Sequence, residues 1–240
     1  MTGAANWRLQ VFEALPSTQN LVQKLAEAGE PAGLAVLARR QTAGRGQGVR
    51  VWASPAGNLH LSVLLRPRGA ARDLPGWALL FAVALREAAS ELVPAARLRL
   101  KWPNDLLLDG AKCAGVLTEA ELAEDGSIAQ IVAGFGVNLA HAPALEGRET
   151  AALGDADVEG FARVLLDRIA AWTRIRLTEG FAPVRAAWIA AGPERGALLT
   201  LKRDGAGVTG RYEGLAEDGA LLLSTGGRVH AFHAGEIEGR

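Results

Sequence analysis

Residues 100–115 read LKWPNDLLLDGAKCAG, and this stretch indicates the fold. Leu98, Leu100 and Trp102 alternate with basic residues, which is the period of a strand, and the proline that follows ends regular pairing. Asp109-Gly110 then separates two apolar runs, which is typical of a two-residue hairpin turn. Hairpin strands run antiparallel, so we expect an α+β fold with a mixed or antiparallel sheet and packed helices, not a doubly wound parallel sheet.

Outward from this hairpin, the apolar residues follow either a strand period or a helix period. Alternation predicts a short strand at 9–11 and a half-buried strand at 59–65. We also expect strands at 34–38 and 128–132. Helical spacing predicts helices at 74–93, 157–179 and 181–190, and a capped helix between Ser17 and Gly29.

The pattern of apolar residues along the chain changes at Gly192. Beyond it, short apolar runs at 198–201, 208–212, 221–223 and 229–232 are separated by glycine-containing turns. This spacing predicts a small antiparallel barrel. We therefore divide the chain into a large domain, 1–191, and a C-terminal barrel, 192–240.

Composition excludes several classes of protein. Twenty-six basic residues balance 26 acidic ones, so no overall field would draw the chain onto DNA or an anionic membrane. Cys113 is the only cysteine, which fits a reducing compartment, and we expect a cytoplasmic protein. The longest apolar run, 77–85, is far shorter than the roughly 20 residues that span a bilayer. The N-terminus has no basic stretch followed by an apolar one, so we expect no signal peptide.

A loop at residues 39–52, RRQTAGRGQGVRVW, is rich in glycine and arginine. Glycine lets backbone N–H groups approach a ligand, and guanidinium groups bind phosphate or carboxylate in a bidentate manner. Trp52 at its end offers a ring that covers an aromatic base. We expect the loop to be extended and to bind an anion, most simply a nucleotide.

A second set of polar residues follows the strand that ends near Trp102. Lys101, Asn104, Asp105 and Lys112 lie within twelve residues, and the hairpin turn folds Lys112 back toward Asp105. A lysine beside a carboxylate suits transfer at a phosphate, because the ammonium neutralises developing charge while the carboxylate holds Mg²⁺ or orients the lysine.

Five motifs, in this order and at these distances, resemble the biotin protein ligase family. They are PSTQN at 16–20, QTAGRGQGVRVW at 41–52, KWPNDLLL at 101–108, KCAG with Val116-Leu117 at 112–117, and GFGVNL at 134–139. The resemblance covers nearly the whole chain. It implies a class II synthetase-like catalytic domain over 1–191 and an SH3-like barrel over 192–240.

The resemblance also implies an activity and a set of site residues. Biotin would be activated by ATP and Mg²⁺ to biotinyl-5′-AMP, and the biotinyl group would pass to a lysine of a carboxylase carrier domain. The implied catalytic residues are Lys112, Arg45 and Asp105, and Asp105 is also a candidate ligand for Mg²⁺. The implied biotin contacts are Ser17, Thr18, Gln19, Gln41, Gly44, Arg45, Lys112, Gly115 and Leu117, and the adenylate contacts are Arg45, Gly46, Gln47, Arg50, Trp52, Asn104 and Asn138.

Other functions stay open at this point. A lipoate-type acyl ligase shares the adenylation chemistry, but its loop is expected to read near Arg-Arg-x-Ser-Gly-Gly-Gly, whereas this chain has Arg-Arg-Gln-Thr-Ala-Gly-Arg. A biotin-sensing regulator would need a DNA-binding domain of about 50 residues. Only sixteen residues precede Ser17, so we expect a short form without that domain. A homodimer is compatible with the sequence, which does not fix the oligomeric state.

The loop departs from the family pattern at two positions. The usual reading is Gly-Arg-Gly-Arg-x-Gly-Arg-x-Trp, whereas here Gln47 replaces the second arginine and Val49 replaces a glycine. Valine with a positive φ would cost about 1–2 kcal/mol. We therefore expect either a different path for the loop or a turn taken over by Gly48.

The loss of one guanidinium next to the adenylate predicts that biotinyl-5′-AMP escapes faster from this chain than from its Gln47→Arg variant. The added guanidinium would hold a phosphate oxygen by a charge-assisted hydrogen bond. The release rate, followed by filter binding or HPLC, tests this hypothesis. Equal rates for the two proteins would refute it.

Overall fold

The computed structural model describes residues 7–144, 147–203 and 206–238, and its main element is a seven-stranded mixed sheet. Only β1 and β2 pair in parallel among its neighbouring strands, and the other pairs are antiparallel. The α+β prediction is therefore confirmed. The strands, in spatial order, are β1 (Arg8–Phe12), β2 (Leu34–Ala38), β3 (Leu59–Leu65), β7 (Ile128–Val137), β6 (Ala111–Leu122), β5 (Asp105–Leu108) and β4 (Leu98–Lys101).

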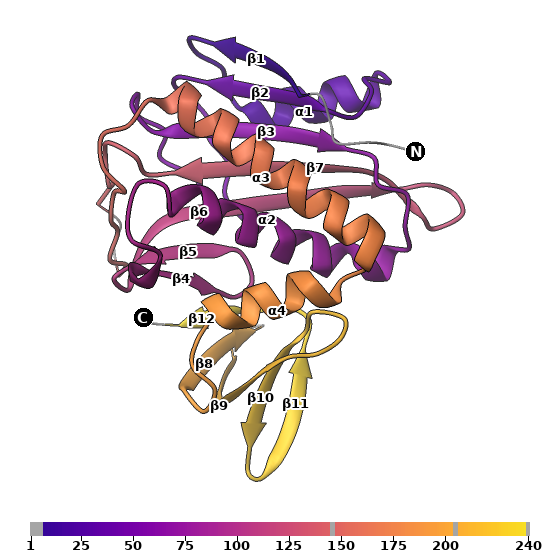
Figure 1. Cartoon of the computed structure of the whole chain (residues 1–240), viewed down its shortest axis with the longest axis vertical. Coiled ribbons are helices and arrows are strands. Elements are labelled where there is room, and N and C mark those ends of the chain that lie inside the picture. Colours follow the sequence, from indigo (N-terminus) through magenta and orange to yellow (C-terminus); the bar gives the residue numbers. More distant parts are fainter. Residues whose placement is uncertain (1–6, 145–146, 204–205, 239–240) are drawn as a thin grey trace.

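Helices cover the two faces of this sheet unequally. Helix α1 (Thr18–Glu27) packs on β2, β3 and β7 from one side. Helices α2 (Leu74–Ala89) and α3 (Val158–Glu179) cross the other side, and α4 (Ala182–Ala191) follows them toward the C-terminal sheet (Figure 1). Part of the face that carries α1 is thereby left for a ligand.

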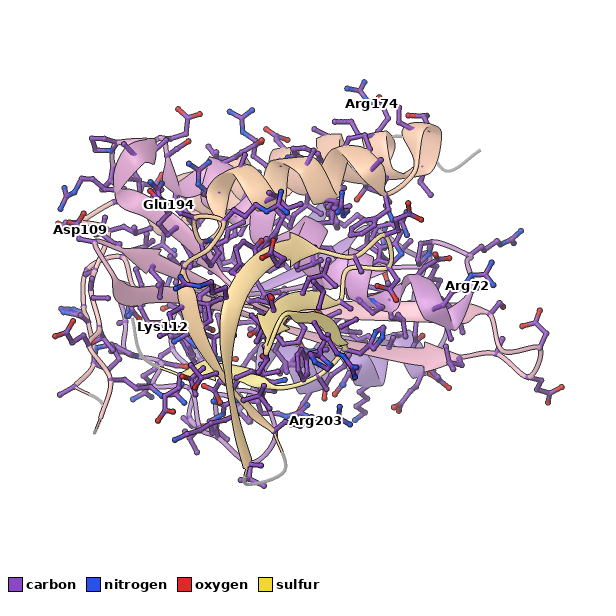
Figure 2. The ribbon with its side chains drawn as sticks, turned by 90° about the horizontal axis from the view of Figure 1, so that it is seen from below. Arg72, Asp109, Lys112, Arg174, Glu194 and Arg203 are labelled. Atoms are coloured by element: carbon purple, nitrogen blue, oxygen red, sulfur yellow. The ribbon has the colours of Figure 1, made fainter. Side chains whose placement is uncertain are left out.

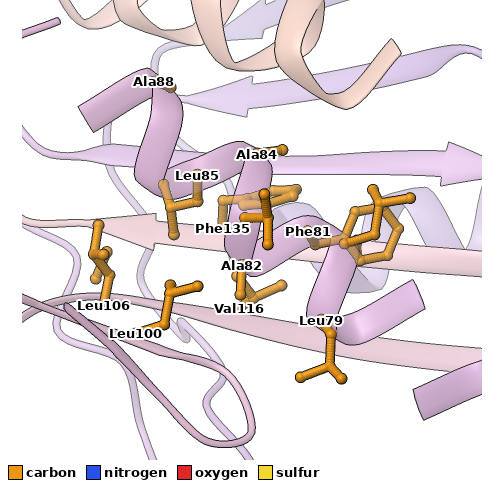
Figure 3. Close-up of a cluster of buried hydrophobic side chains, with 14 of the residues drawn as sticks. Leu79, Phe81, Ala82, Ala84, Leu85, Ala88, Leu100, Leu106, Val116 and Phe135 are labelled. Carbon is orange, nitrogen blue, oxygen red and sulfur yellow. The ribbon is translucent and has the colours of Figure 1, made fainter. Parts of the chain in front are cut away.

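The main core lies between α2 and the sheet. Leu79, Phe81 and Leu85 of α2 are buried against strand residues that include Val116 and Phe135 (Figure 3). The α2 helix ends at Ala89, four residues before the predicted end. Apolar residues cover most of the surface of α2 because this helix packs against both α3 and the sheet.

Strand β3 corrects one expectation. Every residue of Leu59–Leu65 is buried, including His60 and Ser62, so the strand is not half-buried. Alternation of apolar and polar residues predicted one wet face. Here the polar residues lie under α1 and the loop at 39–58, where they find hydrogen-bond partners such as the Pro55 carbonyl for His60.

The predicted hairpin between β5 and β6 is confirmed. Asp109 and Gly110 have φ values of 49° and 88°, the positive values that a two-residue hairpin turn requires. The turn returns β6 along β5, with Asp105 opposite Gly115 and Leu107 opposite Lys112. The turn thus sets the register on which Asp105 and Lys112 meet.

The C-terminal part forms a five-stranded antiparallel sheet below α4 (Figure 1). Four of its strands were predicted; the short fifth strand, β12, was not. The closure into an SH3-like barrel and the boundary at 192 stay predictions. In spatial order the strands are β11 (Arg228–Phe232), β10 (Leu221–Thr225), β9 (Ala206–Leu215), β8 (Leu198–Arg203) and β12 (Glu236–Glu238).

Helix α4 joins the two parts of the molecule. Its Trp188 is completely buried in the same cluster as Tyr212 of β9. Arg185 donates from Nε to the carbonyl oxygens of Leu215 and Ala216 at 2.8 and 3.0 Å. The small sheet is therefore attached by both apolar packing and hydrogen bonds.

No helix in the described part of the chain combines the length and the apolar character needed to cross a membrane.

The burial of Trp188 predicts a large loss of stability on truncation. Trp188→Ala should lower the free energy of unfolding by about 3–5 kcal/mol, because it removes a large, completely buried apolar side chain and leaves a cavity in the core. Urea denaturation followed by circular dichroism measures the change. Leu198→Ala is the control, because Leu198 is 68% exposed and should change stability by less than about 0.5 kcal/mol. Similar losses for both variants would contradict the packing described here.

Candidate active site

A cleft that is partly open to solvent lies on the face of the sheet that carries α1. Concave sites of this kind are where small-molecule ligands bind. Its walls come from the start of α1, the glycine-rich loop, strands β3, β6 and β7, the β4–β5 turn and β12. The predicted site residues that line it are Ser17, Thr18, Gln19, Gln41, Arg45, Gly46, Gln47, Arg50, Trp52, Asn104, Asp105, Lys112, Gly115 and Leu117.

Two predicted residues lie outside the lining. Gly44 is behind Trp52 and Gln41, where an added Cβ would lie 2.5 Å from the Trp52 carbonyl oxygen. Asn138 is buried just after β7, and its Nδ2 donates to the Ala151 carbonyl at 3.1 Å. Its Oδ1 is buried without a hydrogen-bond partner among the described residues. A contact between Asn138 and a nucleotide stays a prediction.

Glycines open the floor of the cleft. A Cβ at Gly136 would lie 2.3 Å from the Trp52 ring, and one at Gly134 would lie 2.6 Å from Gln19 Oε1. The GFG sequence at 134–136 therefore lets two side chains lie directly on β7. The Trp52 indole N–H is buried there without a partner among the described residues, so it is a donor available to a ligand.

One end of the cleft is polar. Gln41 Oε1 accepts from the Thr18 backbone N–H at 2.8 Å and lies 3.1 Å from Thr18 Oγ1, and Gln41 Nε2 donates to Ser54 Oγ at 3.0 Å. Ser17 caps α1 by accepting from the Asn20 N–H at 3.4 Å while it also lines the cleft. The cap and the wall of the cleft thus share one short segment.

The other end of the cleft holds a close ion pair. Lys112 Nζ donates to Asp105 Oδ1 at 2.5 Å, and the two side chains are 18% and 11% exposed. The ammonium also lies 5.5 Å from the centre of the Trp52 ring. Figure 2 shows Lys112 on the side of the molecule away from α3, which carries Arg174. The predicted convergence of Lys112 and Asp105 is confirmed.

The glycine-rich loop forms a small hairpin. Arg45 bridges to Val51, the Gly46 N–H donates to the Arg50 carbonyl at 2.8 Å, and Gly48 has a φ of 65°. The second alternative for the departure at Val49 is therefore correct, since Gly48 takes the left-handed position. The expectation of a simply extended loop is wrong, because these backbone hydrogen bonds fold it back on itself.

The sequence suggested that Arg45 contacts biotin and the adenylate, but in the structure its guanidinium pairs with Glu119. Arg45 lines the same cleft as Lys112, but its Nη2 pairs with Glu119 Oε1 at 2.6 Å. Its Nη1 also donates to Asn20 Oδ1 at 2.8 Å. In this structure, the guanidinium is therefore engaged by β6 and α1, and Asp105 is the partner of Lys112.

Arg50 connects the loop to the C-terminal sheet. Its Nη1 lies 2.9 Å from Glu236 Oε2 on β12, and Arg148 Nη2 donates to Glu236 Oε1 at 2.5 Å. Burial raises the pKa of the Glu236 carboxyl, but the guanidinium groups of Arg148 and Arg50 outweigh burial and hold that pKa below its ordinary value. The small sheet thus supplies one wall of the cleft.

The residues of this region that sequence reasoning missed include Ser62, Glu119, Arg148 and Glu236. Ser62 and Glu119 had a usable signal, since each is a polar residue within a mainly apolar strand. Glu236 had none, because it meets Arg50 over a separation of 186 residues.

The geometry does not favour a metal site built by the protein. The Asp105 carboxylate predicted to hold Mg²⁺ is paired with Lys112. Within residues 7–144, 147–203 and 206–238, no group of three or more histidine, cysteine or acidic side chains converges as metal ligands do.

Comparison with known proteins identifies the family. The model of the biotin/lipoate A/B protein ligase family matches residues 11–138, and that of the biotin protein ligase C-terminal domain matches residues 200–240. The chain belongs to the biotin/lipoate A/B protein ligase family. The resemblance inferred from the five motifs is thereby confirmed, and the matched ranges include both the glycine-rich loop and the Lys112–Asp105 pair.

Individual members of the family align over most of the chain. A biotin–acetyl-CoA-carboxylase ligase of Paracoccus denitrificans is 39% identical and covers 78% of this chain and 82% of its own length. The bifunctional ligase/repressor BirA of Bacillus subtilis is 30% identical over 94% of this chain and 72% of its own length. The Aquifex aeolicus biotin protein ligase, solved with biotin and ATP, superposes with a TM-score of 0.80 at 27% identity, covering 97% of this chain and 98% of the other.

The ion triad at Glu236 predicts a pH-dependent contribution to stability. Because the folded-state pKa of Glu236 is lowered, the contribution is full above the unfolded-state pKa, about 4.3, and is lost as the pH falls through the folded-state value. The difference in melting temperature between the wild type and Glu236→Gln should therefore be greatest above about pH 5 and shrink toward pH 3. A difference that is constant across this range would contradict the ionic role of Glu236.

Proposed function

We propose that this chain activates biotin with ATP to biotinyl-5′-AMP and transfers the biotinyl group to a lysine of a carboxylase carrier domain. The observation that carries the proposal is a single cleft that has polar residues, Thr18 and Gln41, at one end and the Lys112–Asp105 pair at the other. The membership of the chain in this family supports the same proposal. The P. denitrificans relative is named as a ligase of biotin and acetyl-CoA carboxylase. The Trp52 N–H, buried without a described partner, supports a ligand that supplies an acceptor.

In the first step, a biotin carboxylate oxygen attacks the α-phosphorus of ATP. A bond forms between that oxygen and phosphorus, and the bond to the bridging oxygen breaks, so that pyrophosphate leaves with the electron pair. The carboxylate is already ionised at neutral pH, so the step needs no general base. It needs a cation between two anions, and we assign this role to Lys112, which also holds the reactants at a high effective concentration.

In the second step, the amine of the acceptor lysine attacks the biotinyl carbonyl carbon, an amide bond forms, and AMP leaves. The amine must be neutral to attack and must lose a proton afterwards. We assign Asp105 first to orienting Lys112 through its 2.5 Å contact and second to accepting this proton. Asp105 lies in the cleft wall, where a carrier lysine would have to reach.

The nucleotide would occupy the side of the cleft lined by the loop and by the β4–β5 turn. We assign Arg50 to a phosphate and Trp52 and Asn104 to the adenine side, in line with the family motifs. Mg²⁺ would arrive with ATP, as it does in most nucleotide-dependent enzymes, with phosphate oxygens among its ligands, and would screen phosphate charge. Every other role described here belongs to side chains of the chain itself.

A lipoate-type ligase is the second candidate, since the matched family model includes lipoate ligases. The loop reads Gln-Thr-Ala-Gly-Arg at 41–45 without a run of glycines, which favours biotin. Pyrophosphate exchange stimulated by biotin and not by lipoate would agree with the proposal. The opposite preference would overturn it.

Further partners are secondary to this proposal. The net charge of zero gives no field for DNA or an anionic membrane, so we propose neither as a partner. The single cysteine, buried at position 113, fits the reducing cytoplasm. A homodimer stays compatible with the proposal, and analytical ultracentrifugation would determine the oligomeric state.

The role of Lys112 predicts a strong effect on the first step. Lys112→Ala should lower kcat for biotinyl-AMP formation by roughly 10²–10³-fold, because it removes the ammonium that stabilises the transition state. Incubation with biotin, Mg-ATP and a carrier domain, followed by mass spectrometry of the carrier lysine, measures the complete reaction. Lys24→Ala, at an exposed position near the end of α1, is the control and should retain activity. An active Lys112→Ala protein would refute the assignment.

A further inference from the structure

Glu119 of β6 is a hub of hydrogen bonds at the polar end of the cleft. Its Oε1 accepts from Arg45 Nη2 at 2.6 Å. Its Oε2 accepts from Gln19 Nε2 at 2.8 Å and from Gln23 Nε2 at 2.7 Å. An ionised carboxylate only accepts hydrogen bonds, so each of these three side chains must turn a donor toward it.

This constraint fixes the orientation of the Gln19 amide. Gln19 is buried, and because its Nε2 faces Glu119 and the Val132 carbonyl, its Oε1 faces Ser62. Ser62 Oγ therefore donates its proton to Gln19 Oε1, at 3.1 Å. A hydroxyl has one proton, so Ser62 must accept in its other contact.

That other contact is with Thr18. Thr18 Oγ1 lies 2.9 Å from Ser62 Oγ, and both side chains are buried. Since Ser62 accepts here, Thr18 is the donor. Its only hydroxyl proton is shared between Ser62 Oγ and Gln41 Oε1, which lies 3.1 Å away and can only accept. Gln41 Oε1 keeps the backbone N–H of Thr18 as a donor at 2.8 Å. Thr18 Oγ1 is then left with acceptor capacity at the wall of the cleft.

We propose that Glu119 is a positioning residue that sets the hydrogen-bond polarity of the biotin-binding end of the cleft through Gln19, Ser62 and Thr18. The relay makes Thr18 an acceptor for a ligand N–H, and a ureido ring supplies such N–H groups. The inference rests on the proposed function, because it takes this end of the cleft as the site of the biotin ring. Arg45 and Gln23 hold the carboxylate of Glu119 in place for this role.

Glu119→Gln tests the relay because it replaces one of two acceptor oxygens by an NH₂ group. The remaining oxygen should turn to Arg45, since a charged donor forms the stronger hydrogen bond. The new NH₂ group then faces Gln19 Nε2, donor against donor, and Gln19 must turn its oxygen away from Ser62. We expect the dissociation constant for biotin, measured by isothermal titration calorimetry, to rise at least tenfold.

Glu121→Gln is the matched control. Glu121 lies two residues further along β6 and accepts from Gln130 Nε2 at 2.8 Å, outside the cleft lining. Its substitution should leave the biotin dissociation constant within twofold. If Glu119 had a purely structural role, Glu119→Gln would lower the melting temperature and the number of binding-competent sites, but the biotin dissociation constant per site would not change. That result would overturn the inference.

A double-mutant cycle shows whether the effect passes through Gln19. In a Gln19→Met background, where the relay is already broken, Glu119→Gln should weaken biotin binding less than threefold. A tenfold loss in both backgrounds would overturn the inference. If the wild type does not bind biotin at all, the proposed function itself fails. If the wild type binds biotin and Glu119→Gln binds it equally well, only the inference about Glu119 is refuted.

Discussion

The contact between Lys112 and Asp105 is the interaction on which the site depends. Two features bring the pair together. The Asp109-Gly110 turn returns β6 along β5 in a fixed register, and the pairing of the two strands shifts between Leu106 and Leu107. A shift of β6 by one residue against β5 would move Lys112 to the face of the sheet opposite Asp105. The ammonium is then held at the junction of the loop, the floor of β7 and the small sheet, where both substrates of the proposed reaction would carry negative charge.

The floor beneath this pair is shaped by missing side chains. Gly134 and Gly136 let Gln19 and Trp52 rest on the backbone of β7, with distances too short for any Cβ. A sheet normally presents side chains on both faces, and a cleft on a sheet therefore needs such positions. On the opposite face of the sheet, the same strand contributes Phe135 to the core that packs against α2. One strand therefore serves packing on one face and the cleft on the other.

Local patterns predicted most of the fold and the list of residues around the cleft, but not their pairing. The strand at 59–65 and the helix capped by Ser17 follow from periodicity and capping, which are local properties. The full burial of β3, the short strand β12 and the direction of Arg45 depend on contacts between distant segments. Arg45 meets Glu119 and Arg50 meets Glu236 across 74 and 186 residues, and no pattern within a few residues encodes such a choice of partner.

If Arg50 binds a phosphate as proposed, Glu236 would couple the small sheet to nucleotide binding, because Glu236 pairs with Arg50. If a phosphate takes Arg50, it competes with a carboxylate that Arg50 already binds on β12. Thermodynamic linkage is reciprocal, so a change that weakens the attachment of the small sheet frees Arg50 for the phosphate, and occupancy by nucleotide in turn loosens that attachment. Arg148, which keeps its own hold on Glu236, limits how far the sheet can then depart.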